Sequence, residues 1–170
     1  MRWSVEVGDI LDTPADVLVC SANVFLNLSG GVGGAFLLRY GPEMQCALHE
    51  YLQERGIRHI HRGAVVSMPP CGSPYRVVLH AVAVDASYES SSAVVTSVVQ
   101  QCLSDASKVG ARIVALPALA TGYGELLVRD FISGVQPLLK VAFPPVEEVR
   151  IVVRSSDDAQ AISASLSVLS

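Results

Sequence analysis

Two glycine-rich segments are the parts of the sequence best suited to binding a phosphate. The first, Ser29–Phe36, reads SGGVGGAF and opens an expected helix. Glycine adopts backbone angles that other residues rarely reach and lets a ligand approach closely. The start of a helix also presents N–H groups that lack intrahelical partners. The segment matches neither the Walker pattern nor G-x-G-x-x-G, so a plain tight turn is the alternative to a phosphate cradle.

The second segment, Pro117–Gly124, reads PALATGYG and has the same design. It follows an apolar run and combines small residues, two glycines, a hydroxyl and an aromatic ring. Two such loops, each after a strand and before a helix, could clamp a diphosphate from both sides. The pair is therefore more specific than either loop alone.

Two polar residues stand where expected strands end. Asp9 follows Gly8, and its carboxylate can accept a hydrogen bond from an exocyclic amine or a ribose hydroxyl. Asn23 follows the second strand, and its amide offers donors and an acceptor to a ribose diol. The alternative roles are structural: Asp9 as a helix or turn cap, and Asn23 as a turn residue.

Apolar runs and amphipathic segments alternate along the chain, which predicts the elements that position these loops. We expect strands at Trp3–Val7 (a sheet edge), Asp16–Ser21, Ala64–Met68, Tyr75–Val84, Ala111–Leu116 and Val149–Arg154. We expect helices at Gly33–Tyr40, Glu43–Arg55, Ser91–Val109, Val128–Val141 and Asp157–Leu169. The alternation predicts one α/β domain over residues 1–170, with a largely parallel sheet covered by helices on both faces. Ligands of such sheets bind beyond the carboxyl ends of the strands.

Composition and charge narrow the classes of partner. The formal net charge of −4 argues against a general nucleic-acid binder. One basic cluster stands out, formed by Arg55, Arg58, His59, His61 and Arg62. We expect it to be a solvated turn after a helix, with a phosphate or RNA contact as the alternative.

The cysteines and the length of the apolar runs indicate in which cellular compartment the protein acts. Cys20, Cys46, Cys71 and Cys102 lack metal-ligand spacing, so we expect no metal site, free thiols and a reduced, cytoplasmic setting. No apolar run has the length of about 18 residues that a membrane span needs, so we expect no membrane partner.

The motifs, taken together, resemble the macro-domain family. The resemblance rests on ordered segments that span nearly the whole chain: GDI at 8–10, ADVLV at 15–19, AN at 22–23, GGVGGAF at 30–36, RVVLHAV at 76–82 and the strand and loop of 113–124. It implies a three-layer α/β/α fold with a mostly parallel mixed central sheet. It also implies that the cleft binds ADP-ribose or an ADP-ribosyl group, with no cofactor.

The resemblance assigns roles to individual residues. Asp9 would recognise the adenine amino group, the Ile10 backbone would contact the ring, and Arg154 or Ser155 would stack on it. Ala22 and Asn23 would meet the distal ribose. The first loop would wrap the distal ribose and a phosphate through Gly30, Gly31, Val32, Gly33, Gly34, Ala35 and Phe36. The second loop would enclose the diphosphate through Pro117, Leu119, Ala120, Thr121, Gly122, Tyr123 and Gly124.

Two departures from the family pattern bear on catalysis. Gly33 stands where the hydrolase branch has an aspartate that helps to activate water, and the second loop is one residue shorter than the common form. The catalytic groups are therefore unknown, with Asn23, Thr121 and Tyr123 as weak candidates. We expect His80 to be a core histidine.

Three functions are open at this point. The first is a monomeric module that reads free ADP-ribose or ADP-ribosylated macromolecules, without sequence-specific nucleic-acid binding. The second is an enzyme that removes ADP-ribose from a protein, nucleic acid or metabolite, or dephosphorylates ADP-ribose 1″-phosphate. The third is a different nucleotide- or RNA-binding α/β domain, against which the acidic balance argues.

Overall fold

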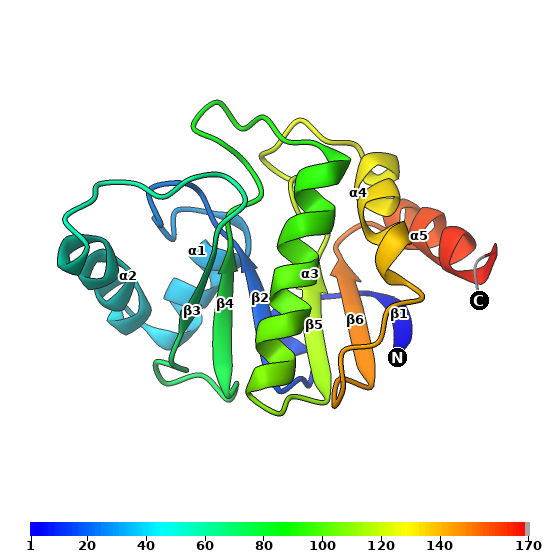
Figure 1. Ribbon diagram of the computed structural model, residues 1–170, viewed down its shortest axis with the longest axis horizontal. Helices are drawn as coiled ribbons and strands as arrows, with labels where there is room; N and C mark the ends of the chain where they lie inside the picture. The colour runs from blue at the N-terminus through cyan, green and yellow to red at the C-terminus, as the bar shows by residue number, and fades with distance from the viewer. Residues whose placement is uncertain (169–170) are drawn as a thin grey trace.

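A six-stranded sheet forms the centre of the computed structural model, which describes residues 1–168. Across the sheet the strands are β1 (Arg2–Val7), β6 (Glu148–Val153), β5 (Ile113–Pro117), β2 (Val17–Ser21), β4 (Val77–Ala81) and β3 (Val65–Met68) (Figure 1). Neighbouring strands are parallel except β3 and β4, which are antiparallel. The predicted mostly parallel mixed sheet is confirmed.

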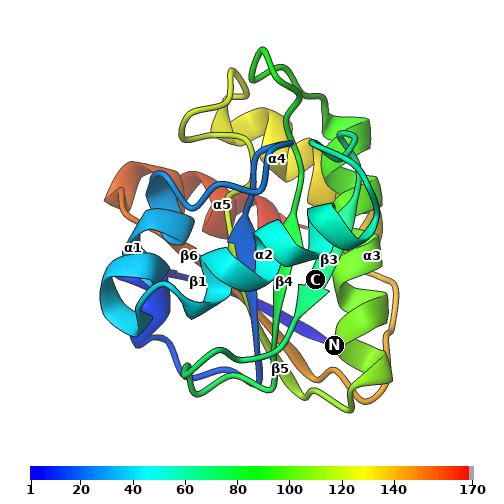
Figure 2. The ribbon, with the colours of Figure 1, turned by 90° about the vertical axis from the view of Figure 1, so that its left-hand side faces the viewer.

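Helices cover both faces of the sheet, as Figures 1 and 2 show. One layer holds α1 (Gly31–Tyr40) and α2 (Glu43–Glu54), and the other holds α3 (Ser92–Lys108), α4 (Val128–Val135) and α5 (Ser156–Val168). Short 3-10 turns occupy Ile10–Asp12 and Gln136–Leu138. The three-layer α/β/α architecture expected from the sequence is confirmed.

The strands are apolar on both sides because each side meets a helical layer. In β2, Val17 and Val19 pack into the core beneath α3 and α4, whereas Leu18 and Cys20 pack into the core beneath α1 and α2. All four side chains are fully buried. Side chains alternate along a strand, so this run of apolar residues serves both cores at once.

Several predicted bounds differ from the observed ones for local reasons. The α4 helix ends at Val135 and not at Val141, because Pro137 has no N–H to continue it and the chain tightens into a 3-10 turn. The α1 helix begins earlier than expected, at Gly31, and β4 stops at Ala81 although Val82–Val84 stay buried. The predicted end of the last helix, Leu169, lies outside the described residues.

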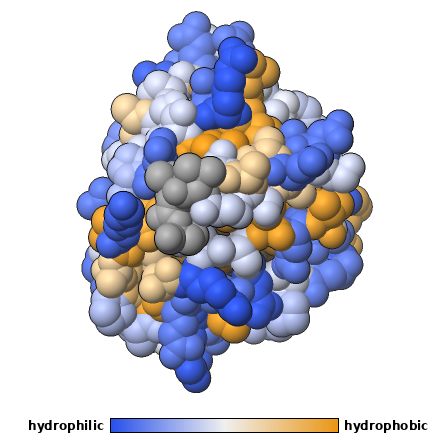
Figure 3. All heavy atoms as spheres, turned by 90° about the vertical axis from the view of Figure 1, so that its right-hand side faces the viewer, coloured by the Kyte–Doolittle hydropathy of each residue, from blue (hydrophilic) through white to orange (hydrophobic). Residues whose placement is uncertain are grey.

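The prediction that the first strand lies at a sheet edge is confirmed, since β1 pairs only with β6. Arg2 and Glu6 are exposed on this strand, and charged residues discourage edge-to-edge pairing. Figure 3 shows the side of the molecule with β1 and α5, where hydrophobic side chains form separate groups among hydrophilic ones. No helix within residues 1–168 is long and apolar enough to cross a membrane.

Asp16 fixes the amino ends of two neighbouring strands. Its Oδ2 accepts hydrogen bonds from the N–H groups of Arg112 (2.8 Å) and Ile113 (3.0 Å), and its Oδ1 lies 3.3 Å from the guanidinium of Arg76. Burial tends to raise the pKa of this carboxyl. The two backbone hydrogen bonds and the nearby arginines outweigh burial and hold the pKa below its usual value.

We expect Asp16→Asn to lower the free energy of unfolding by about 1–2 kcal/mol at pH 7, because it removes charge-assisted hydrogen bonds. A lowered native pKa stabilises the fold above the unfolded pKa of about 4, and this contribution is lost as the pH falls through the native pKa. The deficit of the variant, measured by urea denaturation, should therefore shrink below pH 4. Glu50→Gln, on the exposed face of α2, is the control. A deficit that stays constant from pH 7 to pH 3 would contradict the account.

Candidate functional site

A cleft of about 630 Å³ opens at the carboxyl ends of the parallel strands. Its walls are the segments that follow β1, β2, β4, β5 and β6, which gather at one edge of the sheet (Figure 1). Parallel strands bring their following loops together in this way, as expected from the alternating pattern. The volume is that of a site for a small organic molecule.

Asn23 holds the loop that follows β2. Its Oδ1 accepts hydrogen bonds from the N–H groups of Phe25 (3.0 Å) and Asn27 (3.2 Å), and its Nδ2 donates to the carbonyl of Asn27 (2.9 Å). Most of the hydrogen-bonding capacity of the amide is thus used within the loop. One Nδ2 hydrogen is left over, so Asn23 serves the structural role weighed from the sequence while it also lines the cleft.

The α2 helix supports the same loop from behind. Gln45 accepts a hydrogen bond from the Leu28 N–H (2.7 Å) and donates one to the Leu26 carbonyl (3.0 Å). His49 lies within hydrogen-bond distance of both Gln45 (2.9 Å) and the Asn27 side chain (3.0 Å). The loop is therefore fixed by side chains that do not themselves line the cleft.

The α1 helix begins at the end of this loop without a capping side chain. Gly30 is its N-cap, and Gly31, the first helical residue, has a φ of 54°, which favours glycine. The first helix-type bond is donated by Gly34 to the Gly30 carbonyl. The N–H groups of Gly31, Val32 and Gly33 precede it and have no intrahelical acceptor. Gly30, Gly31 and Val32 line the cleft, so this helix start faces the space where an anion would sit.

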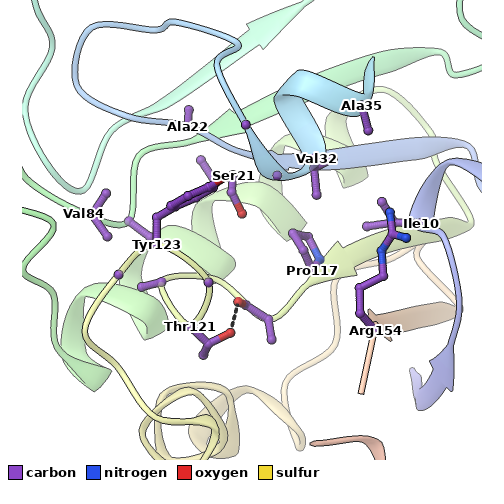
Figure 4. A pocket seen from close by; sticks show the side chains of 18 of the residues that line it. Ile10, Ser21, Ala22, Val32, Ala35, Val84, Pro117, Thr121, Tyr123 and Arg154 are labelled. Carbon is purple, nitrogen blue, oxygen red and sulfur yellow. Dashed lines mark hydrogen bonds between the residues drawn. The ribbon is translucent and has the colours of Figure 1, made fainter. Parts of the chain in front are cut away.

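The second glycine loop lies opposite the first, and Tyr123 spans the gap between them. A Cβ atom on Gly30 would lie only 2.7 Å from the Tyr123 Oη, so the ring rests directly on that glycine. Figure 4 shows the ring extending from its loop toward Ser21 and Ala22. Tyr123 is 75% exposed, so the contact bridges the mouth of the cleft and is not part of the core.

Asp9 serves the capping role weighed from the sequence and also lines the cleft. Its Oδ1 accepts a hydrogen bond from the Leu11 N–H (3.0 Å) and caps the turn at Ile10–Asp12. Its Oδ2 lies 3.4 Å from a guanidinium nitrogen of Arg39 and 3.5 Å from one of Arg154. The Arg154 side chain extends toward Ile10, which follows the neighbouring strand (Figure 4). One carboxylate oxygen is thus structural, and the other lies among cations at this end of the cleft.

The cleft gathers most of the residues expected to bind a ligand. These are Asp9, Ile10, Ala22, Asn23, Gly30, Gly31, Val32, Ala35, Pro117, Ala120, Thr121, Gly122, Tyr123, Gly124 and Arg154. They come from four separate stretches of sequence that meet because β1, β6, β5 and β2 are neighbours in the sheet.

Five expected residues lie outside the cleft lining. Gly33 packs against the Leu28 side chain, and Gly34 packs against the Ser29 backbone. Phe36 and Leu119 are buried in the two cores. The Ser155 Oγ accepts a hydrogen bond from the Asp158 N–H (3.3 Å) at the start of α5. The motifs located both loops that line the cleft, but Gly33, Gly34, Phe36 and Leu119 pack against the protein behind it.

Sequence reasoning missed part of the lining. The missed residues are Gly8, Ser21, Asn27, Ala81, Ala83, Val84, Tyr88, Val152, Val153 and Asp158, whereas Ser29 and Ala118 fall within the two glycine-rich segments expected to bind phosphate. The stretch after β4 is the main omission, because only the pairing of β2 with β4 brings it to the cleft. A polar turn follows the buried strand β4, and this pattern was the sequence signal that could have placed the stretch at the cleft.

Two groups near the cleft that could act as a base or a nucleophile, His80 and Cys20, are buried beneath it. His80 is buried, contacts the Met44 sulfur at 3.3 Å and lies outside the lining, and burial lowers its pKa to about 4. This confirms the expected core histidine. Burial raises the pKa of the neighbouring Cys20 thiol to about 12, so it stays protonated. The carboxylates of the described lining are Asp9 and Asp158.

Gly124 and Gly122 form a matched pair for testing the second loop. A Cβ on Gly124 would lie 2.3 Å from the Ala120 carbonyl oxygen, whereas one on Gly122 would meet no atom within 4 Å. Gly124→Ala should therefore displace backbone and lower the free energy of unfolding by about 1–3 kcal/mol. Gly122→Ala should change it by less than about 0.5 kcal/mol. Equal losses in chemical denaturation would show that the loop conformation is wrong.

Comparison with known proteins agrees with this architecture. The Macro domain family model matches residues 19–132. A macro domain-containing protein of Streptomyces griseus is 34% identical over 148 residues, which cover 86% of this chain and 84% of that protein. A second macro domain-containing protein, of Streptomyces nogalater, is 33% identical over 147 residues. The alignment covers 86% of this chain and 81% of that protein.

Solved structures share the fold. The Oceanobacillus iheyensis macrodomain with ADP superposes with a TM-score of 0.83 at 22% identity, covering 97% of this chain and 90% of that one. The Trypanosoma brucei macrodomain in complex with ADP-ribose has a TM-score of 0.75 at 21% identity. The match covers 95% of this chain and 68% of that one. The family model spans most of the chain, and the glycine loops lie where the motifs require. The chain therefore belongs to the macro-domain family.

Proposed function

We propose that this protein binds ADP-ribose or ADP-ribosyl groups in the cleft between its two glycine loops. The observation that carries the proposal is the uncapped start of α1 facing the second loop across a cleft of about 630 Å³. Unpaired N–H groups at a helix start attract phosphate oxygens whatever the net charge of the protein. The similar macrodomains named above were solved with ADP and with ADP-ribose.

The adenosine would occupy the end of the cleft near β1. The Asp9 Oδ2 is not used in capping and can accept a hydrogen bond from the adenine amino group. Arg154 is 75% exposed at the side chain, so its guanidinium would leave Asp9 and lie flat on the ring beside Ile10. The assignment of adenine stacking to Arg154 rather than Ser155 is supported by the capping role of Ser155.

The diphosphate and the distal ribose would occupy the middle and the far end. Arg154 is the one cationic side chain in the described lining, so the phosphates would depend on backbone N–H groups of both loops. The distal ribose would lie by Ala22 and Asn23, where one amide hydrogen of Asn23 remains to be donated. Tyr123 would have to move from Gly30 or close over the ligand.

The proposal is binding without turnover, and the hydrolase and phosphatase functions are its alternative. Position 33 carries no carboxylate, and its Cβ direction points at Leu28, away from the cleft. Of the weak catalytic candidates, Asn23 is engaged in its loop and Thr121 donates its hydroxyl hydrogen to the Ala118 carbonyl at 2.8 Å (Figure 4). Neither is poised to take a proton from water.

The wider setting of the protein is part of the proposal. We take it to act as a cytoplasmic monomer on free ADP-ribose or on an ADP-ribosylated macromolecule. Its four unpaired cysteines, three of them buried, support a reducing compartment.

Isothermal titration with ADP-ribose tests the binding, and Gly122→Glu tests the placement of the second loop. Open space around Gly122 lets the fold accept the new side chain, whose charge and bulk would then enter the phosphate path. We expect saturable heat for the natural protein and at least a 30-fold weaker affinity for the variant. Ala164→Glu, which adds the same charge on the exposed face of α5, should bind normally. Normal binding by a folded Gly122→Glu protein would overturn the placement.

Turnover is tested by incubating the protein with substrates that carry ester-linked, base-linked and phosphate-linked ADP-ribose. We expect no release of ADP-ribose or phosphate above the uncatalysed rate, because no carboxylate stands at position 33. Release that disappears in Asn23→Ala would instead establish the enzymatic alternative.

A further inference from the structure

The wall of the cleft contains a carboxylate that the sequence motifs did not single out. Asp158 lines the cleft from the first turn of α5, and the residue is half-buried. Within residues 1–168 its carboxylate forms no hydrogen bond and no ion pair. Asp9, the other carboxylate of the described lining, is held by the Leu11 N–H and by two guanidinium groups. Asp158 therefore has both carboxylate oxygens free to accept hydrogen bonds from a ligand.

The start of α5 leaves this carboxylate unused. Residues 155–158 read SSDD, which fits the capping-box pattern of a serine followed three residues later by an acidic residue. One half of the box is formed, since the Ser155 Oγ accepts a hydrogen bond from the Asp158 N–H at 3.3 Å. In the other half the carboxylate would accept one from the Ser155 N–H, and the described chain does not form that bond. The Asp158 side chain is thus part of the cleft wall and does not cap its own helix.

The order of the strands places Asp158 along the ligand. Four neighbouring strands run in the order β1, β6, β5, β2 (Figure 1). The proposed function puts adenine beside Asp9, which follows β1, and the diphosphate between the loops that follow β5 and β2. The adenosine ribose joins these two groups, so it would lie over the segment that follows β6. Asp158 belongs to that segment, and the ribose is therefore the part of the ligand nearest to it.

A carboxylate at this place suits hydroxyl groups and opposes phosphate. Its two oxygens can accept hydrogen bonds from vicinal ribose hydroxyls. In dinucleotide-binding sites of another fold an acidic residue holds the free 2′-hydroxyl, whereas an arginine accommodates a 2′-phosphate. Arg154 is the one cationic side chain of the described lining, and it lies 3.5 Å from the Asp9 carboxylate. Two carboxylates thus face one guanidinium, and a further phosphate would add to an excess of negative charge.

We propose that Asp158 is a specificity-determining residue that selects ligands with free hydroxyls on the adenosine ribose. Its carboxylate accepts hydrogen bonds from those hydroxyls and repels a phosphate attached to them. The ligand class is therefore narrower than nucleoside diphosphates at large: it excludes the 2′-phosphorylated and 2′-deoxy forms. The inference rests on the proposed function, since the adenine and the diphosphate position the ribose.

Isothermal titration of the natural protein with three ligands tests the selection without any substitution. The ligands are ADP-ribose, the analogue that lacks the 2′-hydroxyl of the adenosine ribose, and the analogue that carries a 2′-phosphate there. We expect the deoxy analogue to bind about tenfold more weakly than ADP-ribose, the effect of one lost hydrogen bond to a charged group. The phosphorylated analogue should also bind more weakly than ADP-ribose, by about tenfold or more, because of repulsion between like charges.

Asp158→Ala tests whether this carboxylate is the cause. The preference for ADP-ribose over the deoxy analogue should fall from about tenfold to less than about threefold, because the contact is then absent with both ligands. Asp157→Ala is the matched control: Asp157 is exposed, lies outside the cleft lining and contributes the same charge to the same helix turn. It should leave the preference unchanged.

Asp158→Asn separates the charge of the carboxylate from its hydrogen bonding. The amide keeps one acceptor oxygen but leaves a single carboxylate against Arg154 in the lining. We expect this variant to bind the phosphorylated analogue about tenfold more tightly than the natural protein does. Asp157→Asn, the corresponding control, should not improve binding of that analogue.

The outcomes distinguish this inference from the proposed function. If ADP-ribose binds and the phosphorylated analogue binds as tightly, Arg154 accommodates the phosphate, so the selection by Asp158 is wrong while the proposed function stands. The inference is also wrong if the natural protein discriminates but the Asp158 variants keep its preferences. If ADP-ribose does not bind, the proposed function fails and the inference fails with it.

Discussion

The unpaired N–H groups at the start of α1 are the constraint around which the site is built. A helix start needs acceptors, and Gly30 has no side chain to supply one. The loop before it must therefore be held open by other means. Asn23 closes that loop from within, while Gln45 and His49 on α2 hold it from behind. The side chains that could accept hydrogen bonds from these N–H groups are engaged within the loop. The N–H groups are therefore left for a hydrogen-bond acceptor on a ligand.

The second loop forms the wall of the cleft opposite the first, and its shape depends on glycines and not on charged side chains. Its glycines differ in purpose: Gly124 has no room for a Cβ beside the Ala120 carbonyl, whereas Gly122 faces open space. The exposed ring of Tyr123 contacts Gly30, and through this contact the two loops meet. The sheet order brings the loops together, because β2 and β5 are neighbours although nearly a hundred residues separate them in sequence.

The three-layer fold could be predicted from the sequence. Apolar runs such as Val17–Cys20 are stable only in a sheet that is buried on both faces. The order of the motifs located both glycine loops. The sequence could not show which members of each loop turn inward, so Gly33 and Phe36 were expected in the cleft although they pack behind it. It could not place Tyr88 either, because that depends on the pairing of β4 with β2 and on the turn that Asp85 closes.

The most direct test of the central claim is to follow the backbone amide resonances while ADP-ribose is added. Hydrogen bonds from N–H groups to phosphate oxygens change amide shifts strongly. The account predicts large, saturable shifts for Gly31 and Val32 at the start of α1 and for Thr121–Gly124 in the second loop, together with smaller ones near Asp9. Saturable shifts confined to other surfaces, with both glycine loops unchanged, would contradict it.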